Sequence, residues 1–473
     1  MPSIAPELSH RLIWPNLSPP MRLAALRGKP VALLFGCTSS AWTRQRLDDL
    51  AQLQRRYGAR LQVAAILVRR FDFERDPRSI EQLQIEQSLS FPVALDAEWT
   101  AWQQFGIGAW PTILLIDGQG RIQHHVVGDG PIGTLEERVQ SMLDAGQGAT
   151  GEESATLQTQ VSMPQTPLCF PRAIAVSDAC LYVADSGHHR ILECDYAGNV
   201  LRQFGTGREG LQDGPAEETA FKRPQGLALQ RDALFVADTG NHALRRIDLR
   251  SGDTETILGN GRRGFEQHAA GAGNGIALLD QPCGIQASLN RLYIAMAGEN
   301  CICSYDLVGR SLQPVAGSGH LSVSDGIGVV ASFAQPAALA LRQDVLYACD
   351  AAGSALRAVY LRDGRVQTLL GESTFEFGRI DGPRHAARVQ YPCAIALDLK
   401  EPVLWVLDTG NDRLCSLRLG GGVLCTYALP QPLHSPAGLA CSENTVWIAD
   451  TGAHAVLRLD TRDGTLRPVP VGE

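Results

Sequence analysis

The sequence contains no Cys-x-x-Cys pair, although twelve of its 473 residues are cysteine. A dithiol redox site and most zinc sites use two cysteines at this spacing, so neither is supported. Several cysteines instead lie in apolar runs that predict buried strands, where a thiol behaves as a small hydrophobic group: Cys283, Cys349, Cys393 and Cys441. Cys301 and Cys303 would share one side of a strand but lack further ligands at zinc spacing. We therefore expect no metal and no cofactor.

Positive charge is also scarce. The chain has 42 Lys and Arg against 50 Asp and Glu, a formal net charge of −8. Nucleic-acid binding requires clustered cations, so this composition disfavours a nucleic-acid partner. No stretch approaches the length of a membrane span, and the first residues lack a basic segment followed by an apolar one. We expect a soluble, cytoplasmic protein that does not bind membranes.

A short phrase recurs along most of the chain: apolar strand formers, then a small residue, then a turn that contains glycine. The phrase occurs six times, at intervals of 42 to 58 residues. Its last strand residues are Asp185, Asp238, Met296, Asp350, Asp408 and Asp450. A motif of strand formers and glycine turns at this spacing is typical of a β-propeller blade. Six occurrences predict six blades, which must stack around an axis to bury their faces.

Each blade is expected to contain four strands. In the second blade these are residues 224–229, the phrase ending at Asp238, residues 241–247 and residues 254–259. Long glycine-rich loops, such as 205–216, join one blade to the next. In a propeller these loops and the turns after the phrase emerge on the same face, where binding usually takes place.

The front of the chain reads differently. Strands are expected at 31–35, 61–68, 111–118 and 121–127, with helices at 40–57, 80–89 and 135–143, which is the element order of thioredoxin. We assign 1–148 to a thioredoxin-like domain, 149–165 to a polar linker and 166–473 to the propeller. The segment 155–162 has β character and either adds an outer strand to the last blade or leads into the first. The predicted fold is thus an α/β domain followed by an all-β propeller.

The redox positions of the front domain carry hydroxyls. In a thioredoxin-like fold the nucleophilic cysteine begins the first helix, where the helix dipole lowers its pKa. That position is Ser40 here, and the resolving position is Thr43. Ser40 is also a preferred helix N-cap. Pro111 lies where the fold places its cis-proline. Cys37 is a candidate redox thiol if the motif is aligned to start at Cys37 instead of at Ser40. This residue precedes the helix, however, where the helix dipole has little effect, so an unreactive loop cysteine is favoured.

Residues 14–16, 20–30, 69–74 and 101–112, together with the blade phrases, resemble the NHL repeat-containing protein 2 family over essentially the whole chain. The resemblance implies a thioredoxin-like domain joined to a six-bladed NHL propeller. Members of that family usually carry Cys-Cys-x-x-Cys at the start of the first helix. Here the same run is Ser39-Ser40-Ala-Trp-Thr43, so the redox motif is degenerate.

Several propeller residues are candidates for binding or structure. The repeated Asp residues are predicted to cap turns rather than to share an ion, because they recur in nearly every blade. Candidate binding residues on the loop face are His188, His189, Asn241, His242, Asn411, His454, Arg262 and Arg263. The two arginines belong to the only basic cluster of the propeller, which lies in the second blade. If the cluster has a structural role, its side chains form salt bridges along the edge of that blade. Histidines on that face also leave open a zinc site at the propeller mouth.

Our hypothesis from the sequence is a non-catalytic scaffold. In it, a redox-inactive thioredoxin-like domain and the propeller form a surface for a protein or peptide. One alternative is an enzyme, either an oxidoreductase that uses Cys37 or a metal-assisted enzyme at the propeller mouth. Another is RNA binding through the propeller face, which the acidic charge balance disfavours.

Overall fold

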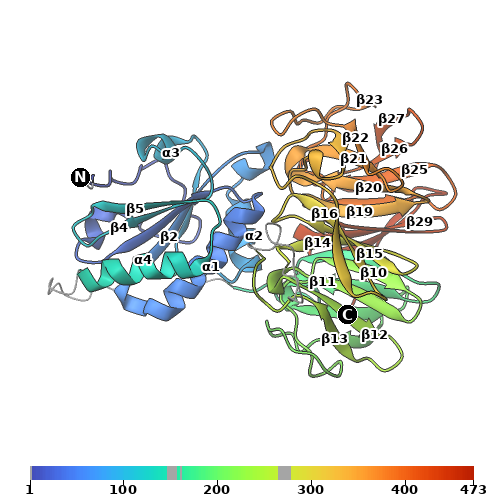
Figure 1. Cartoon of the computed structure of the whole chain (residues 1–473), viewed down its shortest axis with the longest axis horizontal. Helices are drawn as coiled ribbons and strands as arrows, with labels where there is room; N and C mark the ends of the chain where they lie inside the picture. Colours follow the sequence, from blue (N-terminus) through green and yellow to red (C-terminus); the bar gives the residue numbers. More distant parts are fainter. Residues whose placement is uncertain (1–2, 146–156, 160–161, 265–278, 473) are drawn as a thin grey trace. The chain divides into compact units, whose positions relative to one another are not determined.

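The chain is described by a computed structural model over residues 3–145, 157–159, 162–264 and 279–472. It divides into two compact units, Met1–Met163 and Pro164–Glu473 (Figure 1). Most of the predicted linker 149–165 lies outside the described residues. Its residues 157–159 belong to the first unit, because Leu157 N donates to Gln62 Oε1 (2.8 Å) and Thr159 N to Ser90 O (2.9 Å).

The first unit is a five-stranded mixed sheet in the order β3-β2-β1-β4-β5, in which β4 alone runs antiparallel to the other four strands. The strands are β1 (Val31–Gly36), β2 (Gln62–Val68), β3 (Val93–Asp96), β4 (Thr112–Ile116) and β5 (Ile122–Val127). The helices are α1 (Ala41–Tyr57), α2 (Arg78–Glu86), α3 (Thr100–Gln104) and α4 (Ile132–Ala145). Alternate residues of the sheet feed two separate apolar cores, one on each face. This confirms the thioredoxin-like prediction.

Two elements, β3 and α3, were not expected from the sequence. They have four and five residues, too few to show a periodicity. The loop between them is held by Asp96, whose carboxylate accepts the N–H groups of Thr100 (2.8 Å) and Trp102 (2.9 Å). Burial raises the pKa of Asp96. The pairing of β3 with β2, and the contacts of α3 with β3, therefore define these short elements.

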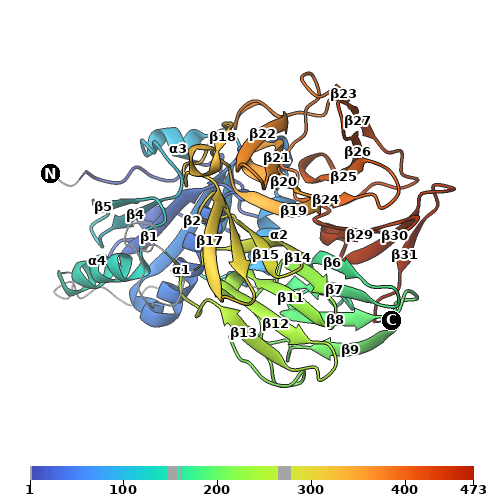
Figure 2. The same cartoon turned by 45° about the vertical axis from the view of Figure 1, so that its right-hand side comes forward.

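The second unit is a propeller of six antiparallel sheets (Figure 2), which confirms the predicted number of blades. Blade 1 has β6 (Pro171–Val176), β7 (Leu181–Asp185), β8 (Arg190–Cys194) and β9 (Val200–Phe204), and blade 2 has β10 (Gly226–Gln230), β11 (Ala233–Asp238), β12 (Ala243–Asp248) and β13 (Thr254–Leu258). Blade 3 has β14 (Pro282–Ser288), β15 (Arg291–Met296), β16 (Cys301–Asp306) and β17 (Ser311–Ala316), and blade 4 has β19 (Pro336–Arg342), β20 (Val345–Asp350), β21 (Ala355–Tyr360), β22 (Arg365–Leu370) and an outer β18 (Gly326–Ile327). Blade 5 has β24 (Ala394–Leu397), β25 (Val403–Asp408), β26 (Arg413–Arg418), β27 (Val423–Thr426) and an outer β23 (Gly382–Pro383), and blade 6 has β28 (Gly438–Ser442), β29 (Thr445–Asp450), β30 (Ala455–Asp460) and β31 (Leu466–Val469).

The first strands of the blades form a closed ring, in which β28 of blade 6 lies next to β6 of blade 1. Glycines permit this close approach. A Cβ at Gly226 would collide with the Cys283 carbonyl of the next blade, and one at Gly438 with the Arg172 carbonyl. An apolar core that contains Trp447 of blade 6 and Ile174 of blade 1 fills the junction where the ring closes.

A hydrogen bond of one type joins every blade to the next. Four residues after the end of each phrase, a residue in the left-handed conformation accepts a backbone N–H from the next blade through its side chain. The acceptor–donor pairs are His189–Arg223 (3.2 Å), His242–Gln281 (3.1 Å), Asn300–Gln335 (3.0 Å), Ser354–Tyr391 (3.2 Å), Asp412–Ser435 (2.6 Å) and His454–Phe170 (3.0 Å). Each donor precedes a proline and also has a positive φ. We call these six hydrogen bonds the blade latches.

A hydroxyl adds a second bond at four of the six junctions. Thr239, Thr409 and Thr451 donate to the carbonyls of Pro282, Pro436 and Pro171 at 2.6–2.7 Å, and Ser186 donates to Pro224 in the same way. Blades 3 and 4 carry Ala297 and Ala351 at this position. The latch is therefore the common element and the hydroxyl is an addition to it.

The latch of His189 makes the stability of the propeller depend on pH. Burial, with Arg223 nearby, lowers the pKa of His189 from 6.5 to about 4. The unfolded chain then binds a proton between these two pH values that the folded chain does not bind. Stability falls as pH falls through that window, by at most about 3 kcal/mol. His189→Asn keeps an acceptor that tolerates the left-handed conformation, as Asn300 shows, and does not titrate.

We expect urea unfolding of the propeller at pH 7.0, 6.0 and 5.0 to show a smaller loss of stability with acid for His189→Asn than for the wild type. His125→Asn, on the exposed face of β5, is the control and should follow the wild type. Equal pH dependence in all three proteins would contradict this role of the latch.

Candidate functional site

The degenerate redox positions form a closed hydrogen-bonded turn at the start of α1. Ser40 is the N-cap of the helix, as predicted, and its Oγ accepts the N–H of Thr43 (3.2 Å). The Oγ1 of Thr43 in turn accepts the N–H of Cys37 (3.3 Å). Both side chains are fully buried. The Trp110–Pro111 peptide bond is cis, so Pro111 occupies the predicted cis-proline position.

Cys37 lies directly after β1, ahead of the helix, as its register predicts. Its side chain is fully buried in the apolar core beside Leu33 and Phe35. Burial raises the pKa of the Cys37 thiol well above its usual range, and the negative charge of Glu74 raises it further. The thiolate, which is the nucleophilic form, is thus strongly disfavoured.

Glu74 holds the loop that carries Cys37, a role that the sequence did not reveal. Its Oε1 accepts Thr38 Oγ1 (2.6 Å) and Ser39 N (2.7 Å), and its Oε2 accepts Arg70 N (2.6 Å) and Phe71 N (2.9 Å). The carboxylate is completely buried. Four hydrogen bonds satisfy it and tie the loop after β1 to the segment after β2, so the loop is fixed from both sides.

A tryptophan cluster lies beside the cis-proline. The ring centroids of Trp99 and Trp102 are 5.3 Å apart, those of Trp102 and Trp110 are 5.8 Å apart, and those of Trp99 and Trp110 are 6.1 Å apart. Trp102 is buried, whereas Trp99 and Trp110 are half-buried. Half-buried aromatic rings next to a fixed turn provide contact area for a peptide at little entropic cost.

The repeated aspartates of the propeller are structural residues, as expected. Each is buried, and its Oδ1 accepts a backbone N–H from the loop that enters the same blade. The donors are Cys169 for Asp185, Lys222 for Asp238, Ala334 for Asp350, Gln390 for Asp408 and His434 for Asp450, all at 2.6–2.7 Å. The carboxylate thereby fastens the entering loop to the turn.

In four blades an arginine of the third strand pairs with the other carboxylate oxygen. The pairs are Arg190–Asp185 (2.8 Å), Arg245–Asp238 (3.0 Å), Arg357–Asp350 (3.3 Å) and Arg413–Asp408 (2.6 Å). Three of these arginines also bind a second aspartate in the long loop, at Asp213, Asp325 and Asp381. Burial raises the pKa of Asp238 and of Asp408 to about 6, and the arginines oppose this rise.

Blade 3 replaces the whole arrangement with sulfur. Met296 stands in place of the aspartate, and Cys301 and Cys303 stand at the two positions from which the other blades provide the arginine. The two sulfurs are 3.9 Å apart and both side chains are buried. Loss of acid and base together leaves no unpaired buried charge, which explains why this blade still folds.

The structure accounts for most of the candidate binding residues of the loop face by internal contacts. His189, His242 and His454 form blade latches. His188 Nδ1 lies 2.8 Å from Asp185 Oδ2, and the amides of Asn241 and Asn411 donate to Asp238 (2.8 Å) and Asp408 (2.7 Å). No group of three or more His, Cys, Asp or Glu side chains is placed for a metal among the described residues. Ligand binding by these side chains stays a prediction.

The basic cluster of blade 2 is largely ion-paired. Arg245 is buried in the pairs described above, Lys222 lies 3.6 Å from Glu209, and Arg246 lies 3.1 Å from Glu255. Arg263 Nε is 3.5 Å from Asp280 Oδ1, and the backbone N–H of Arg262 donates to Asn260. This agrees with a salt-bridged blade edge.

Blade 3 provides a matched test of the ion pair. Arg245→Cys leaves Asp238 buried without its cation and should destabilise the propeller by about 3–5 kcal/mol. Asp238→Met with Arg245→Cys places the residues of blade 3 at these two positions. Its cost should be smaller than the sum of the two single substitutions by about 1–3 kcal/mol, measured by urea unfolding at pH 7.5. Additive costs would show that the two side chains are not coupled.

Three comparisons place the chain among known proteins. Residues 11–125 match the AhpC/TSA family. NHL repeat-containing protein 2 of Gallus gallus is 29% identical over 519 residues, which cover 98% of this chain and 71% of that protein. A second relative is Protein SUPPRESSOR OF QUENCHING 1, chloroplastic, of Arabidopsis thaliana, which is 30% identical. The aligned residues cover 97% of this chain and 47% of that protein. A solved streptogramin B lyase aligns with 65% of this chain and 84% of its own, with 15% identity and a TM-score of 0.43.

None of the helices in the described part of the chain has the length and apolar character needed to cross a membrane. The domain order, the blade number and the similarity over nearly the full length agree with one another. The chain is therefore a relative of NHL repeat-containing protein 2, with a thioredoxin-like domain followed by a six-bladed β-propeller.

Proposed function

We propose that the protein is a non-catalytic binding scaffold in which the thioredoxin-like domain has lost thiol chemistry. The observation that carries this proposal is the state of Cys37. It is the one cysteine of the described first unit, and it is fully buried with its pKa raised. The two positions of a redox dithiol, Ser40 and Thr43, are hydroxyls that cannot form a disulfide and that already bond to the local backbone.

The contacts around these positions support a role in binding. Glu74 fixes the loop that carries Cys37 through two hydrogen bonds, from Thr38 Oγ1 and from Ser39 N, and these hold the buried thiol away from the surface. The cis-proline turn, by contrast, keeps the half-buried Trp99 and Trp110 beside it. A fold that keeps its recognition turn and loses its nucleophile is suited to hold a peptide without reacting with it.

The propeller offers the second surface of the scaffold. Its blades are joined by latches and ion pairs, so its loop face is carried on a rigid frame, and long loops on rigid frames often bind partners. The partner that we propose is a protein or peptide, and the compartment that we propose is the cytoplasm. The internal contacts of the loop-face histidines count against the alternative of metal-assisted chemistry at the propeller mouth.

Thiol reactivity tests the proposal. The reduced full chain is treated with iodoacetamide from pH 6 to pH 9.5, and the labelled peptides are quantified by mass spectrometry. Cys425 is exposed and serves as the internal reference. We expect Cys37 to stay unlabelled across this range and to react only in denaturant, because its thiolate is absent.

A Cys37→Ser variant provides the control for the assignment of the labelled peptide. It should fold normally and should retain any partner that the wild-type protein binds. Faster labelling of Cys37 than of Cys425 at pH 6.5 would overturn the proposal and would favour a thiol-dependent oxidoreductase.

A further inference from the structure

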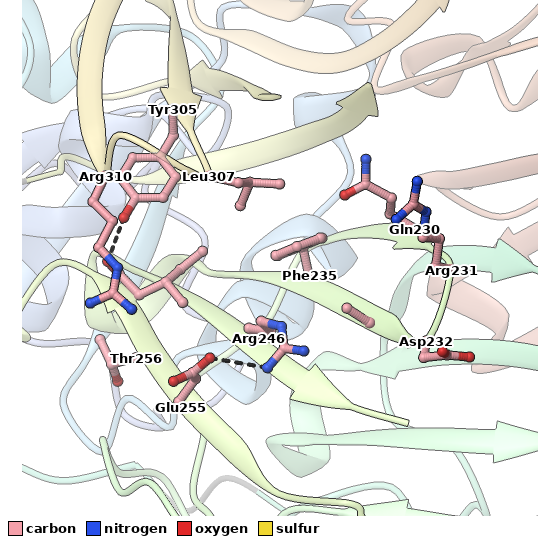
Figure 3. A pocket seen from close by; sticks show the side chains of 12 residues that line it. Gln230, Arg231, Asp232, Phe235, Arg246, Glu255, Thr256, Tyr305, Leu307 and Arg310 are labelled. Atoms are coloured by element: carbon pink, nitrogen blue, oxygen red, sulfur yellow. Dashed lines mark hydrogen bonds and ion pairs between the residues drawn. The ribbon is translucent and has the colours of Figure 1, made fainter. Parts of the chain in front are cut away.

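We propose that a pocket between blades 2 and 3 binds a carboxylate carried on an apolar group. The pocket has a volume of about 490 Å³ and lies between the hairpin of β10 and β11, the strands β12 and β13, and the end of β16 (Figure 3). This volume is within the range of small-ligand sites, roughly 300–1,000 Å³. None of the residues that line it is a redox position or a candidate binding residue of the loop face.

The floor of the pocket is apolar and well fixed. Phe235 and Tyr305 line it with only 3% of each residue exposed, and Ile257 and Leu307 are half-buried beside them. Tyr305 Oη donates to the carbonyl of Ile257 (3.2 Å), so the tyrosine joins the two blades and its hydroxyl already has a partner. Figure 3 shows Phe235 and Leu307 near the middle of the pocket. Such a floor fits an aromatic or branched aliphatic group.

The rim has an excess of positive charge. Arg246 is neutralised by Glu255 (3.1 Å), and Asp232 is neutralised by Arg250 (2.5 Å). Two further arginines, Arg231 and Arg310, also line the pocket. In the part of the chain that the structure describes, neither guanidinium has a hydrogen-bond or ion-pair partner.

These two arginines flank the apolar floor. They lie on opposite sides of the pocket in Figure 3. Each is exposed and is fixed in a turn by a left-handed backbone, with φ of 52° at Arg231 and 49° at Arg310. In blade 4 the turn residue that corresponds to Arg231 is Gln343, with a φ of 54°, so the turn itself does not require a cation. The positive charge of Arg231 is therefore not needed to form the hairpin turn and remains available to a ligand of the pocket.

The chemistry of the ligand follows from the two halves of the site. A guanidinium matches the two oxygens of a carboxylate, and it binds an anion most strongly where no acidic residue competes. The apolar part of the same molecule would cover Phe235 and Leu307. Two sources share this chemistry: the carboxyl terminus of a peptide with an apolar last residue, and a free organic acid.

Calorimetric titration of the full chain at pH 7.5 and low salt tests the proposal with two matched pairs of probes. One pair is 4-phenylbutyrate and 4-phenylbutanamide, and the other is acetyl-Gly-Leu-Phe with a free carboxylate and with an amide. We expect at least one carboxylate to bind with a Kd below about 1 mM and its amide to bind about tenfold more weakly. Binding of the peptide acid assigns the source to a chain terminus, and binding of phenylbutyrate alone assigns it to a free acid. Both results support the site.

Variants locate the binding. Arg231→Gln copies the residue of blade 4, and Arg310→Asn keeps a residue that tolerates the left-handed turn. The arginine that contacts the carboxylate should, when replaced, lose about tenfold in affinity, the other variant should lose less, and neither should change the thermal unfolding temperature. Leu307→Trp should fill the pocket and abolish binding. Arg342→Gln, at the end of the corresponding strand in blade 4, is the control and should bind as the wild type does. No binding of any probe at 10 mM, or equal binding by the arginine variants, would overturn the proposal.

Discussion

The propeller depends on one hydrogen bond repeated around its ring. A side chain in the left-handed conformation accepts the N–H of a residue that stands before a proline in the next blade. The blades differ in sequence, but neighbouring blades must be spaced equally for the ring to close. A contact that is the same at every junction can set this spacing. The latch meets this requirement because both partners have a fixed, positive φ. In the five blades whose phrase ends in aspartate, that carboxylate fastens the entering loop to the same turn.

The buried ion pairs show how much variation this frame accepts. Arg245 and Arg357 are fully buried with their aspartates, whereas blade 3 has sulfur side chains at the same positions. The junction of blade 3 nevertheless keeps its latch, through Asn300. The latch is thus common to all blades, whereas the groups behind it vary. Blade 6 keeps a buried aspartate, Asp450, with His434 Nδ1 at 3.4 Å in place of an arginine from its third strand.

The sequence predicts the features that come from local pattern. The interval between the repeated phrases predicted the number of blades. The spacing of the leucines from Leu47 to Leu53 predicted the buried face of α1, and the position of Ser40 after Phe35 predicted the N-cap of that helix. It did not reveal Glu74, β3 or α3, because these depend on contacts between distant segments.

The blade latches were missed for a different reason. Their acceptors are histidine, asparagine, serine and aspartate, so no single residue type repeats. What repeats is a left-handed backbone conformation together with a side-chain atom that accepts a hydrogen bond, and no single residue type marks either property in the sequence. The same histidines look like ligands in the sequence and act as acceptors in the structure. Their latch bonds became visible only when the donors, which lie 34 to 284 residues away, were placed beside them.

The closure between the last and first blades has a consequence for synthesis on the ribosome. Phe170 and Pro171 find their partners, His454 and Thr451, about 280 residues later in the chain. Until those residues emerge, blade 1 has an unsatisfied edge and the core around Ile174 lacks Trp447. Five blades can be complete while the ring is still open and apolar surface is exposed. The nascent chain therefore passes through a long interval in which protection by a chaperone matters most.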